Sequence, residues 1–194
     1  IRAGIIGLGA GMALAYGRKQ DFFHYYELNP VVTEFAHKHF TFMADTLSKV
    51  EVTHGDGRLA LERELKSPGP RQYDLLHLDA FRGNAPPAHL MTKESFEIYY
   101  KHLREGGVIA VTSHNDYYDA SSLLRGMADL FDAKVVWIPT VKTAECDSNL
   151  GFALISHDPK VFESEAIKRR SSPWPDGGTG KIVWTDQSSS LMSL

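Results

Sequence analysis

The chain alternates between two patterns of hydrophobic and polar positions. Short apolar runs bounded by turn residues are typical of buried strands, and the stretches between them carry apolar residues at helical spacing. The predicted strands are Arg2–Ile6, Phe22–Leu28, Val50–His54, Tyr73–Asp79, Val108–Ser113, Lys134–Ile138 and Leu150–Ser156. The predicted helices are Gly11–Arg18, Pro30–His39, Arg58–Leu65, Lys93–Leu103 and Ser121–Leu130. This alternation predicts βαβ units and therefore an α/β fold.

The boundaries and the order of these elements sharpen the fold prediction. Asn29-Pro30 places a capping side chain before a proline at the first helical position, and Gly106-Gly107 is expected to end the helix before the fifth strand. The last two strands follow each other without an evident helix. We therefore predict a seven-stranded, mostly parallel sheet with helices on both faces, similar to the Rossmann-like fold of class I S-adenosylmethionine methyltransferases.

The composition is that of one ordinary globular domain. Of 194 residues, 43% are hydrophobic and 23% are charged, so we expect residues 1–194 to form one domain with an irregular tail over residues 165–194. A net charge of −3 disfavours a nucleic-acid partner, because proteins that bind phosphate backbones are usually basic. The single cysteine and the absence of zinc-like Cys/His spacing predict no disulfide and no metal site. Apolar runs far shorter than roughly 20 residues predict no membrane span within this chain.

A glycine-rich turn follows the first predicted strand. Gly7, Gly9 and Gly11 allow backbone N–H groups to approach a ligand closely, and Glu27 lies 20 residues after Gly7, at the end of the second strand. This spacing suits a carboxylate that accepts hydrogen bonds from the two ribose hydroxyls of a nucleoside, and a purely structural turn is the alternative. Met12 stands where a dinucleotide fingerprint needs glycine, which disfavours NAD and favours S-adenosylmethionine or its decarboxylated form.

Two further carboxylates follow predicted strands. Asp56 comes after the third strand, where it can accept a hydrogen bond from an adenine amino group while Gly57 lets the ring stack closely. The alternative for Asp56 is a helix N-cap. Asp79 ends the fourth strand. Because ligands of open α/β sheets bind beyond the carboxyl ends of the strands, Glu27, Asp56 and Asp79 are expected to face one crevice.

Together these motifs resemble the polyamine aminopropyltransferases (spermidine synthases), most closely the spermidine synthase-like type that is fused to transporter-like segments. The resemblance covers almost the whole chain. The matching stretches are Gly7-Leu8-Gly9-Ala10-Gly11, Tyr26-Glu27-Leu28-Asn29-Pro30, Gly55-Asp56-Gly57-Arg58, Asp79-Ala80-Phe81, His89-Leu90-Met91-Thr92-Lys93-Glu94, Ile138-Pro139-Thr140, Gly151-Phe152-Ala153-Leu154 and Trp184-Thr185-Asp186. The resemblance implies a nucleoside-binding site formed by Gly7, Gly9, Gly11, Glu27, Leu28, Asp56, Gly57, Asp79 and Ala80.

The resemblance also implies a reaction and its substrates. Members of the family transfer an aminopropyl group from decarboxylated S-adenosylmethionine to a diamine such as putrescine and release methylthioadenosine. The sulfonium activates the adjacent methylene, so no metal is needed, and Asp79 takes the family's catalytic position, where a carboxylate attracts the ammonium and accepts its proton. The implied partners are small-molecule nucleoside and amine substrates. A homodimer in the cytoplasm is the implied assembly, although the parent protein could be attached to a membrane.

Several positions depart from the family pattern. Ala10 replaces an acid of the glycine loop, Asn84 stands near an expected second acid, and Val141 stands where a substrate-binding tyrosine is expected. Asn84 and, through a cation–π contact, Tyr117 are candidate amine-binding residues. The family's N-terminal β domain is expected to be absent, because the chain begins at the first strand. Two alternatives stay open: an S-adenosylmethionine-dependent methyltransferase and a non-catalytic nucleoside-binding module.

Overall fold

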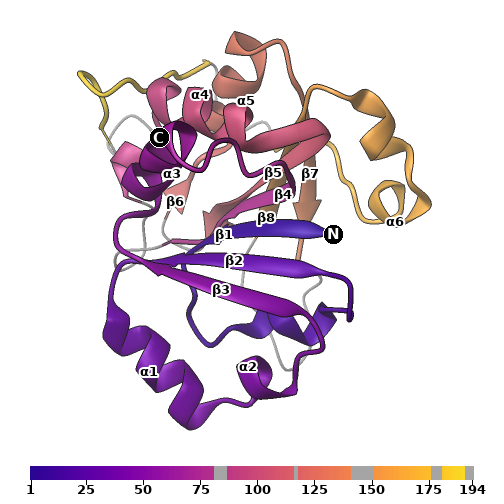
Figure 1. Ribbon diagram of the computed structural model, residues 1–194. Helices are drawn as coiled ribbons and strands as arrows, with labels where there is room; N and C mark the ends of the chain where they lie inside the picture. The colour runs from indigo at the N-terminus through magenta and orange to yellow at the C-terminus, as the bar shows by residue number, and fades with distance from the viewer. Residues whose placement is uncertain (81–86, 116–117, 141–150, 176–180, 191–194) are drawn as a thin grey trace.

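Eight strands form one sheet in the computed structural model, which describes residues 1–80, 87–115, 118–140, 151–175 and 181–190 (Figure 1). The strands are β1 (Arg2–Ile6), β2 (Phe22–Glu27), β3 (Lys49–His54), β4 (Tyr73–Leu78), β5 (Leu103–Asn115), β6 (Tyr118–Asp119), β7 (Lys134–Pro139) and β8 (Gly151–Ser156). The α-helices are α1 (Pro30–His39), α2 (Phe42–Asp45), α3 (Gly57–Lys66), α4 (Lys93–His102), α5 (Ser121–Leu130) and α6 (Glu165–Lys168). Three short 3₁₀ helices are η1 (Met12–Tyr16), η2 (Ala88–Leu90) and η3 (Pro159–Glu163).

The strand order is β3-β2-β1-β4-β5-β8-β7, and the two-residue β6 pairs with β5. Strand β1 pairs in parallel with β2 and β4, β2 with β3, and β4 with β5. Strand β8 is antiparallel to both of its neighbours, β5 and β7. The predicted α/β class with seven main strands is confirmed, and the parallel part of the sheet places the carboxyl ends of β1 to β5 along one edge.

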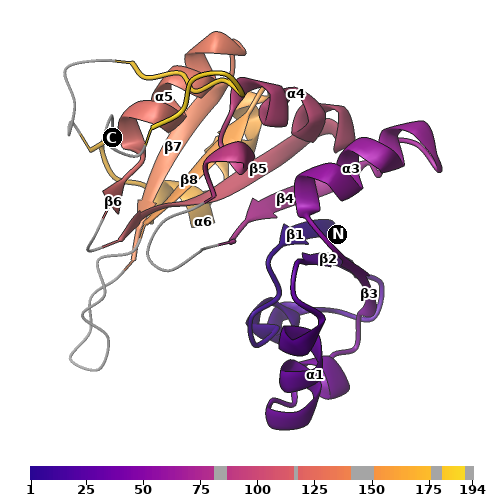
Figure 2. The same ribbon diagram turned by 90° about the vertical axis from the view of Figure 1, so that its left-hand side faces the viewer.

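Helices cover both faces of the sheet, as predicted, but they cover them unevenly (Figure 2). Helices α3, α4 and α5 lie on one face and enclose the larger core. On the opposite face, η1, α1 and α2 lie against β1 to β3 around a smaller cluster that includes Leu14, Phe23 and Tyr25. Within the described residues, no helix is both long enough and apolar enough to cross a membrane.

Side-chain caps fix where three of the four ten-residue helices begin. Asn29 accepts a hydrogen bond from the Val31 backbone N–H (3.1 Å) at the start of α1, as the Asn29-Pro30 sequence predicts. Thr92 caps α4 in the same way. The carboxylate of Asp56 caps α3, so the start of this helix depends on a side chain that the sequence also predicts to contact a ligand.

The first predicted helix is shorter than expected. In place of an α-helix over Gly11–Arg18, the chain forms the five-residue 3₁₀ helix η1. Gly11 before it has a left-handed backbone (φ +78°), and Gly17 after it is extended (φ −72°, ψ 129°). Both glycines therefore leave helical geometry, which confines the helix to the residues between them.

The fifth strand begins earlier than predicted. Helix α4 ends at His102, and β5 starts at Leu103 rather than at Val108. Gly106 has φ +71°, and the register between β4 and β5 shifts near the start of β4. Gly106-Gly107 therefore forms an irregularity inside β5, as glycines do at a bulge, and does not end the preceding helix.

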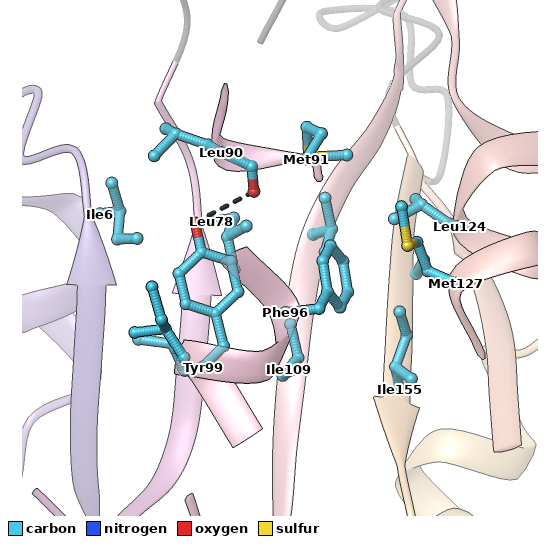
Figure 3. Packing of buried hydrophobic residues seen from close by; sticks show 14 of the residues in the cluster. Ile6, Leu78, Leu90, Met91, Phe96, Tyr99, Ile109, Leu124, Met127 and Ile155 are labelled. Carbon is cyan, nitrogen blue, oxygen red and sulfur yellow. Dashed lines mark hydrogen bonds between the residues drawn. The ribbon is translucent and has the colours of Figure 1, made fainter. Parts of the chain in front are cut away.

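The larger core lies between the sheet and helices α4 and α5 (Figure 3). Phe96 and Tyr99 contribute the aromatic rings of α4, and Leu124 and Met127 contribute the buried face of α5. The Tyr99 hydroxyl donates a hydrogen bond to the Leu90 carbonyl oxygen (3.0 Å), which satisfies the polar end of this buried ring. Burial of these apolar side chains holds both helices on the sheet.

A buried polar network connects β2, β4 and α3. The Tyr26 hydroxyl donates to Glu64 (2.7 Å) and pairs with the Tyr73 hydroxyl (2.8 Å), which also contacts His24 Nδ1 (2.8 Å). Arg71 donates two hydrogen bonds to Glu64, at 2.6 and 2.8 Å. Burial alone would raise the pKa of Glu64, but the hydrogen bonds from Arg71 and Tyr26 outweigh burial and lower it. The network is fully paired, so it stabilises the packing of α3 on the sheet.

One arginine anchors the C-terminal segment. Arg58 of α3 donates two hydrogen bonds to the Asp186 carboxylate (2.5 and 2.7 Å), 128 residues away in sequence, and one to the His89 carbonyl oxygen (2.9 Å). Thr92 also donates to Asp186 (2.8 Å). These hydrogen bonds from Arg58 and Thr92 lower the pKa of Asp186 to about 2. They keep the neighbouring Trp184, which is 2% exposed, in the larger core. Three of the stretches that carry the family resemblance therefore meet at Arg58. They are the stretches that contain Arg58, Thr92 and Asp186.

We expect Arg58→Ala to loosen this C-terminal segment. The substitution removes the bidentate pair with Asp186, and a loss of about 1–2 kcal/mol in the free energy of unfolding is expected for a pair near the surface. Hydrogen exchange over residues 181–190 should accelerate. Arg63→Ala, at an exposed position of the same helix, is the control and should change neither quantity. Unchanged exchange in Arg58→Ala would contradict the anchoring role.

Stability should fall as the pH is lowered from about 6.5 toward 4. Burial lowers the pKa of His24 from 6.5 to about 4, and burial also lowers the pKa of His77 and His102. In this window the unfolded chain binds more protons than the folded chain, so protonation favours unfolding. Urea denaturation across this range should show a decreasing free energy of unfolding. His24→Gln should reduce the slope, whereas exposed His39→Gln should leave it unchanged, and equal slopes for all three proteins would exclude the effect.

Candidate functional site

The ends of three adjacent parallel strands bring predicted site residues together. Gly7 follows β1, Glu27 ends β2 and Asp79 follows β4, and β1 lies between the other two strands. The ladder continues past the strand ends, because the Gly7 N–H donates to the Tyr26 carbonyl oxygen (2.9 Å) and the Asp79 N–H donates to the Ile6 carbonyl oxygen (3.0 Å). Glu27 and Asp79 therefore stand on the two sides of the glycine turn, at the edge where open α/β sheets bind ligands.

Two glycines of the turn are required for different reasons. Gly7 has φ +100°, and a Cβ there would lie 2.5 Å from the Asp79 carbonyl oxygen, so any side chain would push β1 and β4 apart. Gly9 has φ +54°, and a Cβ there would meet nothing within 4 Å. Gly7 is thus needed for strand packing, whereas the open space at Gly9 allows a ligand to approach the backbone.

Glu27 is almost fully buried, at 8% exposure, and both of its carboxylate oxygens accept backbone hydrogen bonds. Oε2 accepts from the Leu8 N–H and Oε1 accepts from the Asn29 N–H, each at 2.9 Å. The side chain therefore holds the glycine turn against the end of β2. A carboxylate offers about four lone-pair positions, so about two remain for a pair of ribose hydroxyls. The structural role of Glu27 and the predicted ligand-binding role are compatible.

The predicted adenine contacts lie at the start of α3. Asp56 caps this helix through the Leu59 N–H (2.9 Å), and its second oxygen contacts His89 Nε2 (2.7 Å). Gly57 is buried, and a Cβ there would lie 2.7 Å from the Ile6 side chain. The small size of Gly57 therefore serves close packing of α3 on β1, a role that the sequence reading did not assign to it.

A cavity of about 580 Å³ lies next to the glycine turn, between η1 and the sheet. Three of the predicted site residues line it, namely Gly7, Gly9 and Asp79, together with Ala10. The other predicted residues do not line it: Gly11, Glu27, Leu28, Asp56, Gly57 and Ala80. The cavity thus extends inward from the turn along the sheet, and the ribose and adenine contacts expected from the sequence lie beside it.

Sequence reasoning missed two residues that line this cavity, Tyr25 and His77. Tyr25 lies two residues before Glu27 in the sequence, and His77 lies two residues before Asp79. Tyr25 Oη and His77 Nε2 are buried without a hydrogen-bond partner in the described part of the chain. The signal was present in the sequence, because alternate residues of a strand point to the same face. When a strand ends in a site carboxylate, the residue two positions earlier therefore faces the same region as that carboxylate.

Asp79 is exposed, and its Oδ1 accepts a hydrogen bond from the Thr112 hydroxyl of β5 (2.9 Å). Burial lowers the pKa of His77, although Asp79 opposes this shift, so the imidazole is neutral at neutral pH. Burial, and to a lesser extent Asp79, raise the pKa of Tyr25, so its phenol stays protonated. Among the described residues that line the cavity, Asp79 is the one carboxylate, and its negative charge would attract a cation.

The remaining predicted residues lie at the edge of the site or beyond the described chain. Leu28 is 70% exposed after β2, and Ala80 is half-buried after β4. The candidate amine-binding residues Asn84 and Tyr117, and the departure at Val141, lie outside the described residues. In the ranges that the structure describes, no three His, Cys, Asp or Glu side chains converge as metal ligands would.

Comparison with known proteins finds relatives of two kinds, although no family model matches the chain. The chain is 35% identical over 124 residues to a polyamine aminopropyltransferase of Vibrio vulnificus and 32% identical over 130 residues to polyamine aminopropyltransferase 2 of Pseudomonas aeruginosa. These alignments cover 61% and 63% of this chain but 40% and 35% of the relatives, so the chain spans less than half the length of either. An N-terminal histidine N-methyltransferase of Emericella nidulans is 29% identical over 133 residues, which cover 66% of this chain and 23% of that protein.

Solved structures show the same fold. A probable spermidine synthase from Corynebacterium glutamicum superposes with a TM-score of 0.70 at 22% identity, covering 98% of this chain and 74% of that one. Human methyltransferase-like protein 13, in complex with SAH, has a TM-score of 0.63 at 17% identity and covers 92% and 86% of the two chains. A spermidine synthase in complex with the transition-state analogue AdoDATO has a TM-score of 0.64 at 18% identity, covering 96% and 63%. The chain therefore has the Rossmann-like α/β fold of class I methyltransferases, and its sequence relatives support a relationship to the polyamine aminopropyltransferase family.

Proposed function

We propose that the chain is the nucleoside-binding catalytic domain of an aminopropyltransferase. The reaction moves an aminopropyl group from decarboxylated S-adenosylmethionine to a diamine such as putrescine and releases methylthioadenosine. The observation that carries the proposal is the placement of Glu27 and Asp79 on either side of the glycine turn, at the ends of the two strands that flank β1. Similarity to two polyamine aminopropyltransferases supports the same reaction.

In the proposed mechanism each carboxylate has a separate task. Glu27 accepts hydrogen bonds from the ribose hydroxyls, and the aminopropyl arm passes over the open backbone at Gly9. The lone pair of the acceptor nitrogen attacks the methylene beside the sulfonium, so a C–N bond forms while the C–S bond breaks and its electron pair goes to sulfur. Before this attack, Asp79 attracts the cationic acceptor and accepts one proton from its ammonium, which frees the lone pair of the nitrogen. The products are a neutral thioether and an extended amine.

Methyl transfer from intact S-adenosylmethionine is the second candidate. It is favoured by the similarity to an N-terminal histidine N-methyltransferase and by Ala10, because a glycine turn without an acid does not select the decarboxylated arm. The two reactions are distinguished by their products, methylthioadenosine from aminopropyl transfer and S-adenosylhomocysteine from methyl transfer.

Further parts of the proposal rest on the sequence pattern and the family resemblance. They are nucleoside contacts by Gly11, Leu28, Asp56, Gly57 and Ala80, amine contacts by Asn84 and Tyr117, a homodimer, a cytoplasmic location and transporter-like segments in the parent protein. The proposal treats residues 1–194 as one catalytic domain. The mass of the purified protein in solution tests the homodimer, and the sequence of the full gene tests the transporter-like segments.

Binding of methylthioadenosine tests the nucleoside site. We expect this ligand to raise the melting temperature, and we expect Glu27→Ala to weaken its affinity about 100-fold, because two hydrogen bonds to a charged group are lost. Glu34→Ala, at an exposed position of α1, is the control and should bind normally. Circular dichroism checks that Glu27→Ala stays folded without its bonds to the turn. If millimolar methylthioadenosine leaves the melting temperature unchanged, the nucleoside site is refuted.

Product analysis tests the reaction. Incubation with decarboxylated S-adenosylmethionine and putrescine should release methylthioadenosine, detected by mass spectrometry, and Asp79→Asn should lower kcat/KM at least about 100-fold through loss of a charged proton acceptor. Asp132→Asn makes the same change at an exposed position and should retain activity. Equal turnover by Asp79→Asn and the unmodified protein would reject the role of Asp79. Exclusive release of S-adenosylhomocysteine from intact donor would favour methyl transfer, and nucleoside binding without any product would favour the non-catalytic module.

A further inference from the structure

The cavity contains two buried polar atoms that lack partners. Tyr25 Oη and His77 Nε2 have no hydrogen-bond partner in the described part of the chain, and Tyr25 is 1% exposed. Both residues line the cavity beside the glycine turn. Roughly nine in ten buried polar groups in proteins are paired, so two unpaired groups in one cavity call for a specific explanation. A bound molecule would supply the missing partner for both.

The sheet register places these two groups in one row. Ile5 of β1 pairs with Tyr25 on one side and with His77 on the other, so the three residues lie side by side on the same face. Neighbouring strands are about 4.8 Å apart, which separates the Cα atoms of Tyr25 and His77 by roughly 10 Å with only Ile5 between them. Asp79 follows two residues after His77 and lies on the same face, one row closer to the strand ends.

The other walls of the cavity are almost entirely apolar. They include Ile5, which lies between Tyr25 and His77 in the sheet, Leu8 and Ala13 from the turn and η1, and the aromatic residues Phe42 and Phe152. Such walls suit a chain of methylene groups. The cavity therefore combines apolar walls with a small group of polar atoms, an arrangement that is typical of small-molecule sites.

The polar groups are suited to a cation. The neutral imidazole of His77 has one nitrogen with a free lone pair, and the protonated phenol of Tyr25 can also accept through its oxygen. Asp79 supplies the negative charge. A primary ammonium has three N–H donors and no acceptor, so it matches one carboxylate, one phenol oxygen and one imidazole nitrogen.

We propose that Tyr25, His77 and Asp79 together bind the primary ammonium of an aliphatic amine, which makes Tyr25 and His77 specificity-determining residues for the acceptor. This inference rests on the proposed function and extends it to two residues beneath the glycine turn. It also gives the site polar contacts to the amine that do not require an acid at position 10 or 84, where this chain has Ala10 and Asn84. A carboxylate close to the ammonium is disfavoured, because it would approach Asp79.

Titration of the full chain with 1,4-diaminobutane tests the proposal. In protein with ¹⁵N-labelled histidine, the Nε2 resonance of His77 should shift on addition of the diamine, with or without methylthioadenosine. Tyr25→Phe and His77→Gln should each weaken the affinity about tenfold, because each removes one hydrogen bond to a charged group. Tyr100→Phe is the matched control, since its hydroxyl is also buried without a partner among the described residues but lies outside this cavity.

Each outcome of this titration bears on a stated claim. A His77 resonance that does not move at saturating diamine overturns the proposal, and this measurement needs no folded variant. Equal affinities for the unmodified protein, Tyr25→Phe and His77→Gln also overturn it. L-ornithine, which is the same diamine with a carboxylate added, should bind at least about tenfold more weakly, and equal binding would overturn the assignment of Asp79. Diamine binding without any turnover would count against the transfer reaction and leave this site standing, because the titration requires no donor.

Discussion

The close approach of β1 and β4 at Gly7 is the constraint on which the rest of the site depends. Because Gly7 has no Cβ, its backbone can lie against the Asp79 carbonyl, and the parallel ladder extends beyond the regular ends of β1 and β4. That extension fixes where the chain leaves the sheet and so sets Glu27 and Asp79 on either side of one turn. The same departure point directs the chain into η1, which covers the cavity along the face of the sheet. A side chain at position 7 would disturb all of these features together.

Glu27 holds the glycine turn from the side of β2, opposite to β4. A buried carboxylate is tolerated only when it is well hydrogen-bonded, and the backbone N–H groups of Leu8 and Asn29 meet this need before any ligand arrives. The turn and the carboxylate therefore hold each other in place. A ligand that uses the remaining lone pairs meets a site that is already ordered, so its binding loses little conformational entropy from the protein.

The sequence is sufficient to predict the features that depend on local pattern. Strands that end in Glu27 and Asp79 can be recognised one at a time, and the parallel arrangement of βαβ units brings their ends to one edge. Other features depend on register or on distant segments, which hydrophobic periodicity does not specify. Tyr25 and His77 share a row only because both pair with Ile5. The anchoring of the C-terminal segment to α3 likewise joins side chains 128 residues apart, a contact that no local pattern encodes.

Charge is the physical difference between the two transfer reactions considered for this site. Intact S-adenosylmethionine carries a carboxylate on the arm that the decarboxylated donor lacks. Two unit charges 4 Å apart interact by about 4 kcal/mol at an effective dielectric constant of 20, so a donor carboxylate within that range of Asp79 would be opposed by more than one ordinary hydrogen bond contributes. The Leu8 N–H, a backbone donor at the turn, is already bonded to Glu27 and does not offset this repulsion. A cationic acceptor gains from the same charge. The charge of Asp79 therefore supports the proposed donor without a carboxylate and the proposed acceptor with an ammonium, even though Ala10 supplies no acid at the turn.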